Sequence, residues 1–575
     1  MTRNYLYRLY TVLNSAQRKG GILVVGLLVC QSFLDFFGLA FFLPLIFLIV
    51  NPTLTATHPL IHTAYEQGGF KSPASFIIFL TIAILIFAIA KNLLSLWIVK
   101  KKARYAYGIS ADLSSRGIRW YSSKDYRDFS GVDFSKVLNL VNNYPLAFAN
   151  NILLPVGTLL SELLVCLLIV TSVAIYDYKI LILLSVILAP IGFFYRYNKK
   201  QLKKVKETLK EQYPLSVKYA LQVIEGLVEI RIFAKETFFK ERYTTSNKRL
   251  TKALAMDHII LTSTTRITEI VTALIVCSLI LYAVLTQRNY QQTILLLGIY
   301  ASASFRIIPS INRILHGSLQ LRTHEYLIQE MKVLSDYHPD DFESLTPPLS
   351  FEKSIELRNI SVRYKGGPHI LHEAGLIISK GEKIALTGKS GEGKTTLLLL
   401  LIGFLKSDAG EILIDGKKIE PGRSWRAFMG YVPQNPYILD GSLAENVAFG
   451  VSHSQIDRQK ILRLMNDLGL MDLVKQLPHG LDEQIGERGV KLSGGQRQRL
   501  AIARALYADA SILVLDEVTN QVNLAIELEI MDLLDDLAKK GKTILMVTHK
   551  IARQDFFDSI YTLTGGKIQR LITHA

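Results

Sequence analysis

Three short stretches in the last third of the chain decide its fold: GKSGEGKTT at residues 388–396, LSGGQ at 492–496 and ILVLDE at 512–517. The first has the form G-x-x-x-x-G-K-[ST], in which glycines let backbone N–H groups surround phosphates at the start of a helix. The third is an apolar run, typical of a buried strand, that ends in two acidic residues. Together they predict a nucleoside triphosphate site.

Each residue type in these stretches suits one step of phosphoryl transfer. Lys394 is expected to reach the β- and γ-phosphates, and Thr395 to ligate Mg²⁺. Asp516 is expected to complete the Mg²⁺ shell, and Glu517 is the candidate general base that orients or deprotonates water. The remaining residues that we expect to bind the phosphates are Gly388, Lys389, Ser390, Gly391, Gly393 and Thr396.

The LSGGQ stretch narrows the prediction, because residues 354–575 closely resemble the cassettes of ATP-binding cassette (ABC) ATPases. This resemblance implies that Gln434 in YVPQN senses the γ-phosphate and contacts Mg²⁺, that His549 in MVTHK is the switch histidine, and that Tyr364 stacks on adenine. It also implies that the signature touches the ATP of a second cassette, through Ser493, Gly494, Gly495 and Gln496. The cofactors would be ATP and Mg²⁺, and the partner a second copy of the chain.

The chain departs from the family pattern at one place. Residues 520–523 are NQVN, where the family has S-A-L-D after D-E-x-T. Asn523 therefore replaces an aspartate that couples the two sites, and we expect altered turnover or coupling but retained activity.

Composition places the rest of the chain in a membrane. The 575 residues are 49% hydrophobic, with a formal charge of +17 and a mean hydropathy of +0.25. Six apolar segments, each near the roughly 20 residues that a helix needs to cross a bilayer, are 21–50, 74–99, 145–175, 179–198, 265–286 and 292–315. Basic runs such as residues 100–104 and 199–206 flank them, which places the N-terminus and the cassette in the cytoplasm. This argues against a nucleic-acid partner.

The expected fold is thus a membrane α-helical six-span domain followed by a cytosolic α/β P-loop cassette, as in half-size ABC exporters. We predict a helical domain at 1–335, with helices that extend into the cytosol, a linker at 336–353 and the cassette at 354–575. Short helices at 122–130 and 231–239 could touch the ATPase. The three cysteines, all in apolar stretches, predict no disulfide framework, and no cleavable signal peptide is expected.

Four cations within the spans need an explanation, because charge in lipid is costly. Lys91, Arg266, Arg306 and Arg313 all fall near the inner leaflet when helices are counted at about 1.5 Å per residue. They could form a cationic belt for a lipid pyrophosphate. Alternatively they are interfacial anchors, and Arg266 could pair with Glu269. Asp35 and Glu162 could be hydrogen-bond partners in helix packing.

A second resemblance favours the belt. SFRIIPSINRI at 304–314 and GLAFFLPLIFLI at 38–49 resemble bacterial flippases of lipid-linked oligosaccharides. In that family a matching helix carries cavity arginines, here Arg306 and Arg313. Arg266 falls at a corresponding position, Lys91 stands where the family has arginine, and the loop 51–73 would hold a short external helix.

The leading hypothesis is therefore an ATP-driven flippase of a polyprenyl-pyrophosphate-linked oligosaccharide in a bacterial inner membrane. The alternatives are an exporter of drugs, peptides or lipid A-like lipids, and a membrane ATPase that regulates without transporting. The processing type of peptide exporter is not expected, because about 20 residues precede the first span and leave no room for its protease domain.

Overall fold

The structure is a computed structural model of the whole chain. It describes residues 2–41, 45, 48–49, 59–123, 126–129, 133–176, 178–285, 290–336, 351–364, 367–419, 426–486, 491–519, 524–548 and 553–573. The chain divides into two compact units, one of residues 1–123 and 132–338, the other of 124–131 and 339–575. The cassette unit thus includes residues 124–131, which precede the rest of that unit by about 200 positions in the sequence. Each unit is described by itself.

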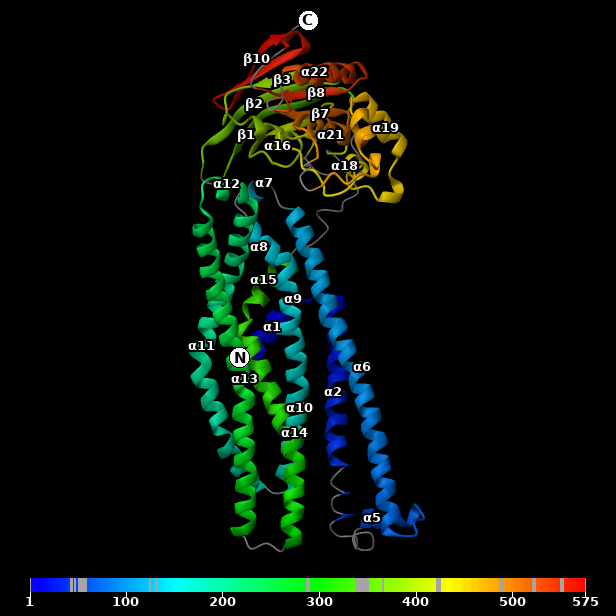
Figure 1. Cartoon of the computed structure of the whole chain (residues 1–575), viewed down its shortest axis with the longest axis vertical. Coiled ribbons are helices and arrows are strands. Elements are labelled where there is room, and N and C mark those ends of the chain that lie inside the picture. Colours follow the sequence, from blue (N-terminus) through cyan, green and yellow to red (C-terminus); the bar gives the residue numbers. More distant parts are fainter. Residues whose placement is uncertain are drawn as a thin grey trace. The chain divides into compact units, whose positions relative to one another are not determined.

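The first unit is helical, and its long helices run beside one another (Figure 1). Helix α11 packs along α13, α10 along α14, and α2 against both α6 and α10. The helices are α1 (Thr2–Val12), α2 (Ser15–Ala40), α5 (Pro59–Gln67), α6 (Pro73–Ser122), α8 (Phe134–Leu138), α9 (Tyr144–Phe148), α10 (Leu154–Tyr176), α11 (Tyr178–Glu225), α12 (Leu227–Ile232), α13 (Glu236–Leu285), α14 (Tyr290–Thr323) and α15 (Tyr326–Ser335), with π-helical turns η1 (Asn139–Asn143) and η2 (Ala149–Leu153).

Local sequence explains where these helices begin and where they widen. Ser72 caps α6 in a reciprocal capping box with Ser75, and Pro73 occupies the first helical position, where no N–H is needed. The π turns η1 and η2 each end two residues before a proline, Pro145 and Pro155. Because proline lacks an N–H and crowds the preceding turn, a wider turn lets the helix continue through it.

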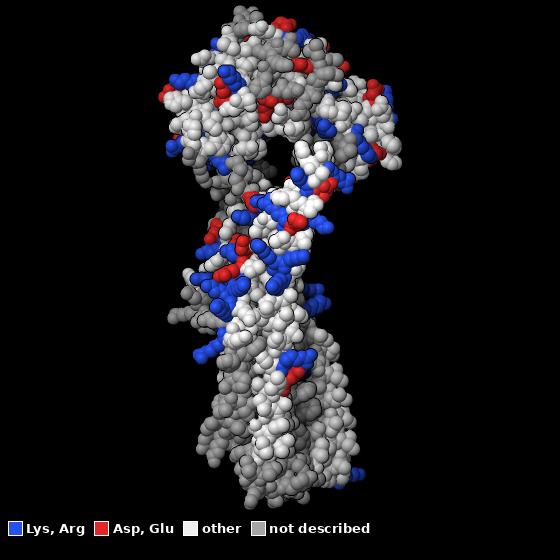
Figure 2. Space-filling model, turned by 60° about the vertical axis from the view of Figure 1, so that its left-hand side comes forward, with Lys and Arg blue, Asp and Glu red and all other residues white. Residues whose placement is uncertain are grey.

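Three helical stretches among the described residues are long and apolar enough to cross a membrane: Ser15–Gly38, Pro73–Ser122 and Phe134–Ser172. They overlap the first three predicted segments, of which only 74–99 lies wholly inside one of these stretches. The other three lie on α11, α13 and α14, where most of the apolar side chains are outside the described residues. Figure 2 shows charged side chains crowded over one half of the helical unit, whereas the described surface of the other half is almost free of them. This pattern fits a part in lipid and a part in water.

The second unit is an α/β cassette with two sheets. One has the order β2-β1-β4-β5, and the other has the order β10-β9-β3-β8-β7-β6 and is parallel from β9 to β6. The strands are β1 (Ser354–Arg363), β2 (His369–Ser379), β3 (Lys383–Thr387), β4 (Ala409–Ile414), β5 (Lys417–Lys418), β6 (Met429–Val432), β7 (Ile512–Asp516), β8 (Thr543–Val547), β9 (Ser559–Thr564) and β10 (Lys567–Thr573).

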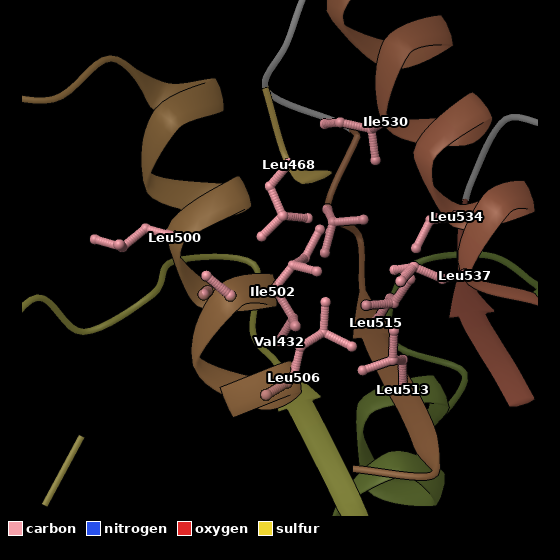
Figure 3. Packing of buried hydrophobic residues seen from close by; sticks show 14 of the residues in the cluster. Val432, Leu468, Leu500, Ile502, Leu506, Leu513, Leu515, Ile530, Leu534 and Leu537 are labelled. Atoms are coloured by element: carbon pink, nitrogen blue, oxygen red, sulfur yellow. The ribbon is translucent and has the colours of Figure 1, made fainter. Parts of the chain in front are cut away.

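The cassette helices cover the parallel sheet and hold its site residues in place. They are α7 (Tyr126–Phe129), α16 (Lys394–Leu401), α18 (Leu443–Val447), α19 (Arg458–Asp467), α20 (Met471–Gln476), α21 (Gly494–Tyr507) and α22 (Leu524–Lys539), with 3₁₀ turns η4 (His453–Gln455), η5 (Gly480–Asp482) and η7 (Gln554–Phe556). Figure 3 shows Ile502 and Leu506 of α21 packed with Leu513 and Leu515 of β7 and with Leu534 of α22. This fully buried cluster fixes the strand that ends at Asp516 relative to the signature helix.

The two expected short helices are both present, but one lies elsewhere. Within 122–130 the structure has α7, where the Tyr126 N–H donates to the Phe404 carbonyl at 3.2 Å and Arg127 pairs with Asp408 at 2.8 Å. The second was predicted at 231–239, and the structure instead places α12 at Leu227–Ile232. The shift follows from Gly226, which interrupts the helix earlier than the sequence pattern suggests.

Candidate nucleotide site and charged cluster

The phosphate-binding loop joins β3 to α16, and its glycines are required by geometry. Gly393 has φ +102°, and a Cβ there would lie 2.5 Å from a methyl group of Ile370. A Cβ on Gly388, at φ +147°, would lie 2.6 Å from the Leu563 carbonyl oxygen. Lys394 begins α16, and its ammonium donates to the carbonyls of Gly388 at 2.8 Å and Lys389 at 2.9 Å. The lysine charge therefore lies inside the loop, where an anion would be bound.

The predicted catalytic glutamate and glutamine lie together. The Gln434 side-chain amide donates to Glu517 at 3.0 Å, and its backbone carbonyl accepts from Gln498 of α21 at 2.7 Å. Glu517 follows β7 with φ +51°, a left-handed conformation that is strained for a residue with a side chain. Its N–H donates to the Val547 carbonyl at the end of β8, which helps to hold this conformation.

Asp516 lies beside this pair with a partner that the sequence did not suggest. The Tyr431 hydroxyl of β6 donates to its carboxylate at 3.3 Å. Burial raises the pKa of Asp516 above its usual range, and the neighbouring Glu517 adds to this, whereas the Tyr431 hydrogen bond and Lys394 lower it. Since Lys394 acts on Asp516 electrostatically, the loop and the end of β7 form one site.

The signature stretch forms the start of α21. Ser493 caps the helix in a reciprocal capping box with Gln496. Gly495 is needed for close packing, because a Cβ there would lie 3.1 Å from a methyl group of Ile526. Gly494 is open, with nothing near its Cβ position. A helix start with free N–H groups is suited to an anion, and the predicted contact with a second cassette stays a prediction.

Several predicted site residues are not placed in this geometry. His549 and Asn523 lie outside the described residues. Tyr364 follows β1 and is partly buried, and the role in adenine stacking stays a prediction. Thr395 is exposed at the first turn of α16, and Thr396 is buried. No group of three or more His, Cys, Asp or Glu side chains that could hold a metal occurs in the described part of the chain.

The helical unit contains a cluster of charged side chains between four helices. Asp35 of α2 accepts from Lys91 of α6 at 3.0 Å and from Arg306 of α14 at 2.8 Å. Glu162 of α10 accepts from Arg313 of α14 at 2.5 Å, and lies 3.7 Å from Arg306. The structure thus brings together three of the four predicted belt cations, around two carboxylates that the sequence left without a specific role.

The cluster is built into the packing of the helices. Glu162 is only 5% exposed at its side chain, and it also accepts from the Ser310 hydroxyl at 2.6 Å. Gly38 makes room for Lys91, since a Cβ there would lie 3.2 Å from the lysine Cδ. The Arg306 Nε is buried and has no hydrogen-bond partner among the described residues. Buried carboxylates in membrane helices nearly always pair, and this rule was the available signal for Asp35 and Glu162.

Arg266 is not part of this cluster. Its guanidinium pairs with Glu269 on the same helix at 3.0 Å, and the two side chains are 75% and 55% exposed. This is the i,i+3 pair that the sequence offered as the alternative to a belt position.

The comparisons with known proteins agree with this architecture. The ABC transporter family profile matches residues 371–520. A relative described as an ATP-dependent lipid A-core flippase of Alkalilimnicola ehrlichii is 32% identical over 358 residues, which cover 61% of this chain and 60% of that protein. An uncharacterised ABC transporter ATP-binding protein of Bacillus subtilis is 30% identical over 406 residues, covering 68% of this chain and 69% of that protein.

The solved structures add a match over nearly the whole chain. The structure of a bacterial Atm1-family ABC exporter with ATP bound has a TM-score of 0.75 and 19% identity, and covers 97% of this chain and 95% of that one. The fold and the site together define a P-loop nucleotide-binding cassette joined to a membrane-helix domain of the ABC exporter type. The chain belongs to the ABC transporter family.

Proposed function

We propose that this protein is an ATP-driven flippase, which moves a polyprenyl-pyrophosphate-linked oligosaccharide or a similar anionic amphipathic lipid from the inner to the outer leaflet of a bacterial inner membrane. The observation that supports this substrate class is the charged cluster between α2, α6, α10 and α14. Three cations, Lys91, Arg306 and Arg313, meet two carboxylates, Asp35 and Glu162, so the cluster has an excess of one positive charge.

The cluster is suited to a phosphate because its cations are already in place. Guanidinium groups bind phosphates through paired hydrogen bonds, and the buried Arg306 Nε is a donor without a partner in the part of the chain that the structure describes. Asp35 and Glu162 hold the cations in position while the site is empty of substrate. A pyrophosphate would take their place as the acceptor, and the more distant sugars would occupy the space between two copies of the chain.

The cassette supplies the energy for this movement, with Mg²⁺ and ATP as cofactors. Oxygen donors at the loop and strand ends, Thr395, Gln434 and Asp516, fit Mg²⁺, which prefers oxygen ligands and retains several waters. The ion would neutralise charge on the phosphates. Glu517 would orient or deprotonate the attacking water, and its contact with Gln434 keeps its carboxylate at the site.

Two copies of the chain would form the working unit. Each chain contains one phosphate loop and one signature helix start, so that two chains complete two equal sites, with Ser493 to Gln496 of each facing the nucleotide of the other. His549 is assigned the γ-phosphate switch role. ATP would close the cassettes, and hydrolysis would reset them.

An exporter of a lipid A-like lipid is the second candidate, because a relative that shares 32% of aligned residues carries the lipid A-core flippase name. Both candidates move a phosphorylated glycolipid and use the same cluster. A drug exporter fits less well, since buried fixed charges at the cluster disfavour an apolar ligand. A regulator without transport would show ATP turnover that is independent of any lipid.

A lipid-stimulated ATPase assay tests the substrate class. Purified protein is given a polyprenyl-pyrophosphate oligosaccharide, and in parallel the same lipid without its pyrophosphate. We expect stimulation only by the first, and its loss in Arg306→Gln and Arg313→Gln with basal turnover retained. Arg249→Gln, which removes an exposed charge on α13, is the matched control. Equal stimulation by both lipids would contradict the proposal. Arg266→Gln tests the fourth predicted belt residue: loss of the stimulation would assign Arg266 to the belt, and retained stimulation would exclude it.

A further inference from the structure

A groove lies at the start of the first membrane helix, far along the chain from the charged cluster residues of α14. It is lined by residues of α1, α2, α6 and α10 and has a volume of about 620 Å³. This is within the range of about 300–1,000 Å³ that is typical of small-molecule sites. Its walls are almost entirely apolar and include Leu9, Leu13, Ile22, Val25 and Leu160.

The groove has a fixed shape because the turn between α1 and α2 is held by specific contacts. Asn14 and Gln17 form a reciprocal pair, in which each backbone N–H donates to the other side chain, at 3.0 and 2.7 Å. The Tyr105 hydroxyl of α6 donates to the Gln17 carbonyl at 2.9 Å. Gly157 lets Lys102 and Leu28 pack closely against α10, since a Cβ there would lie 3.2 Å from the Lys102 Cδ and 3.3 Å from a methyl group of Leu28.

Three cations stand at this apolar groove, Arg18, Lys19 and Lys102. Arg18 donates to the Tyr10 carbonyl at 3.1 Å and lies 4.0 Å from the centre of the Tyr10 ring. The Lys102 ammonium donates to the Thr158 hydroxyl at 2.9 Å. Within the described residues, none of the three forms a salt bridge with a carboxylate. Lys102 is half-buried and lies within electrostatic range of Glu162 and Arg313, so Arg18 and Lys19 offer most of the charge to an anion.

The position of the groove along α2 indicates which layer of the membrane surrounds it. Its residues on α2 lie between Ser15 and Leu28, the first half of the candidate span Ser15–Gly38. Helix α1 presents Leu9 and Val12 to the interior and exposes Tyr7 and Tyr10. An amphipathic helix with exposed tyrosines and basic neighbours is typical of the lipid headgroup region. There the cytoplasmic leaflet attracts lysine and arginine through its anionic lipids.

We propose that this groove is a binding site for one anionic glycerophospholipid of the inner leaflet. Its acyl chain would lie along the apolar walls, and its phosphate would contact Arg18, Lys19 and Lys102. Such a lipid would hold α1 against α2, α6 and α10 as a resident component. It is distinct from the transported lipid and does not depend on the proposed function.

Native mass spectrometry of the full chain, purified in detergent and freed of lipid, tests this site. Phosphatidylglycerol and phosphatidylethanolamine with identical acyl chains are titrated separately. We expect selective binding of phosphatidylglycerol, weakened at least about tenfold in the double variant Arg18→Gln/Lys19→Gln, because two cations near the headgroup are lost. Lys100→Gln, which removes a charge next to the groove but not lining it, should bind as the parent does.

A second pair of variants tests the acyl-chain part without changing charge. Val25→Trp would fill the groove from a position that is 41% exposed, and Leu23→Trp, at 65% exposure outside the lining, is the control. The first should reduce phosphatidylglycerol binding and the second should not. Equal binding of both lipids by the parent would overturn the proposal. Unchanged phosphatidylglycerol binding in Arg18→Gln/Lys19→Gln would also overturn it. The same holds if Val25→Trp changes the fraction of dimer but not the binding of phosphatidylglycerol.

Discussion

Glu162 is the residue on which the charged cluster most depends, because it is buried and serves three donors. Its carboxylate accepts from Arg313 and Ser310 and lies 3.7 Å from Arg306. Removing one partner of a buried ion pair leaves an uncompensated charge, which typically costs about 3 kcal/mol or more. Glu162→Gln should therefore lower the thermal unfolding midpoint of the purified protein markedly, even though glutamine keeps an acceptor for Ser310.

Glu269→Gln provides the matched control for this prediction. It removes the same charge from a pair with arginine, but both partners, Glu269 and Arg266, are exposed. Pairs of this kind contribute less than about 1 kcal/mol. Similar losses of thermal stability in the two variants would show that the Glu162 contacts do not hold the helices together.

Tyr431 tunes the acid behaviour of the nucleotide site. Its hydroxyl donates to Asp516 and opposes the rise in the pKa of that carboxyl, which burial causes. Tyr431→Phe should raise this pKa further, so that Asp516 becomes protonated at a higher pH. The proposed role of Asp516 in holding Mg²⁺ requires the carboxylate form, so the acid limb of Mg-ATP binding should move to higher pH in the variant. An acid limb at the same pH in the parent and Tyr431→Phe would contradict this role for the hydroxyl.

For individual residues, the sequence predicted chemical roles better than it predicted which side chains form hydrogen bonds or ion pairs with one another. Gln434 and Glu517 were assigned from their motifs, and the structure places them 3.0 Å apart. Asp35 and Glu162 could not be matched to Arg306 and Arg313, because the pairs join residues that are 271 and 151 positions apart and depend on how four helices pack. Tyr431 was missed for the same reason, as its contact crosses from β6 to β7.

Helix α7 is part of the cassette unit although its residues precede the cassette by more than 200 positions in sequence. It lies between α6 and α8 in sequence, yet it belongs to the cassette unit. Arg127 pairs with Asp408 at 2.8 Å, and Asp408 also accepts from the Arg363 N–H at 2.8 Å. Burial alone would raise the pKa of Asp408, but these two donors lower it, so that it stays ionised at neutral pH.

The contact predicts a loss of communication when it is broken. In Arg127→Ala and in Asp408→Ala, basal ATP hydrolysis should continue while stimulation by the transported lipid falls, because neither residue lies at the nucleotide site. The double variant should be no worse than Asp408→Ala alone, since Asp408→Ala already removes the pair with Arg127 as well as the contact with the Arg363 N–H. Lys418→Ala, which breaks an exposed pair with Glu411 within the cassette, is the control. Unchanged stimulation in the α7 variant would contradict this role.

At the element scale, long helices were predictable and their ends were less so. The 3.6-residue pattern and charge after residue 200 predicted that helices extend beyond the spans, and α11 and α13 contain 48 and 50 residues. The predicted position of the short helix, 231–239, was wrong, because Gly226 ends the preceding helix and α12 begins directly after it. The π turns before Pro145 and Pro155 were not predicted, since the apolar pattern continues through both prolines.

At the scale of the whole molecule, the cassette contains the nucleotide site and the helical unit contains the charged cluster, and the proposed function requires a second copy of the chain to complete each nucleotide site. The fold matches that of a bacterial Atm1-family ABC exporter over 97% of the chain, and the proposed dimer would combine two helical domains and two cassettes. In that arrangement ATP binding at both sites would close the cassettes and change the helices that contain Lys91, Arg306 and Arg313.

Transport itself tests this account most directly. The measurement is the ATP-dependent movement of a fluorescent polyprenyl-pyrophosphate oligosaccharide across the membrane of proteoliposomes, with the parent chain and with Glu517→Gln side by side. We predict that the lipid changes leaflet only with ATP and the parent chain, and that Glu517→Gln binds ATP but moves no lipid. Active ATP hydrolysis by the parent without movement of this lipid would contradict the proposed substrate.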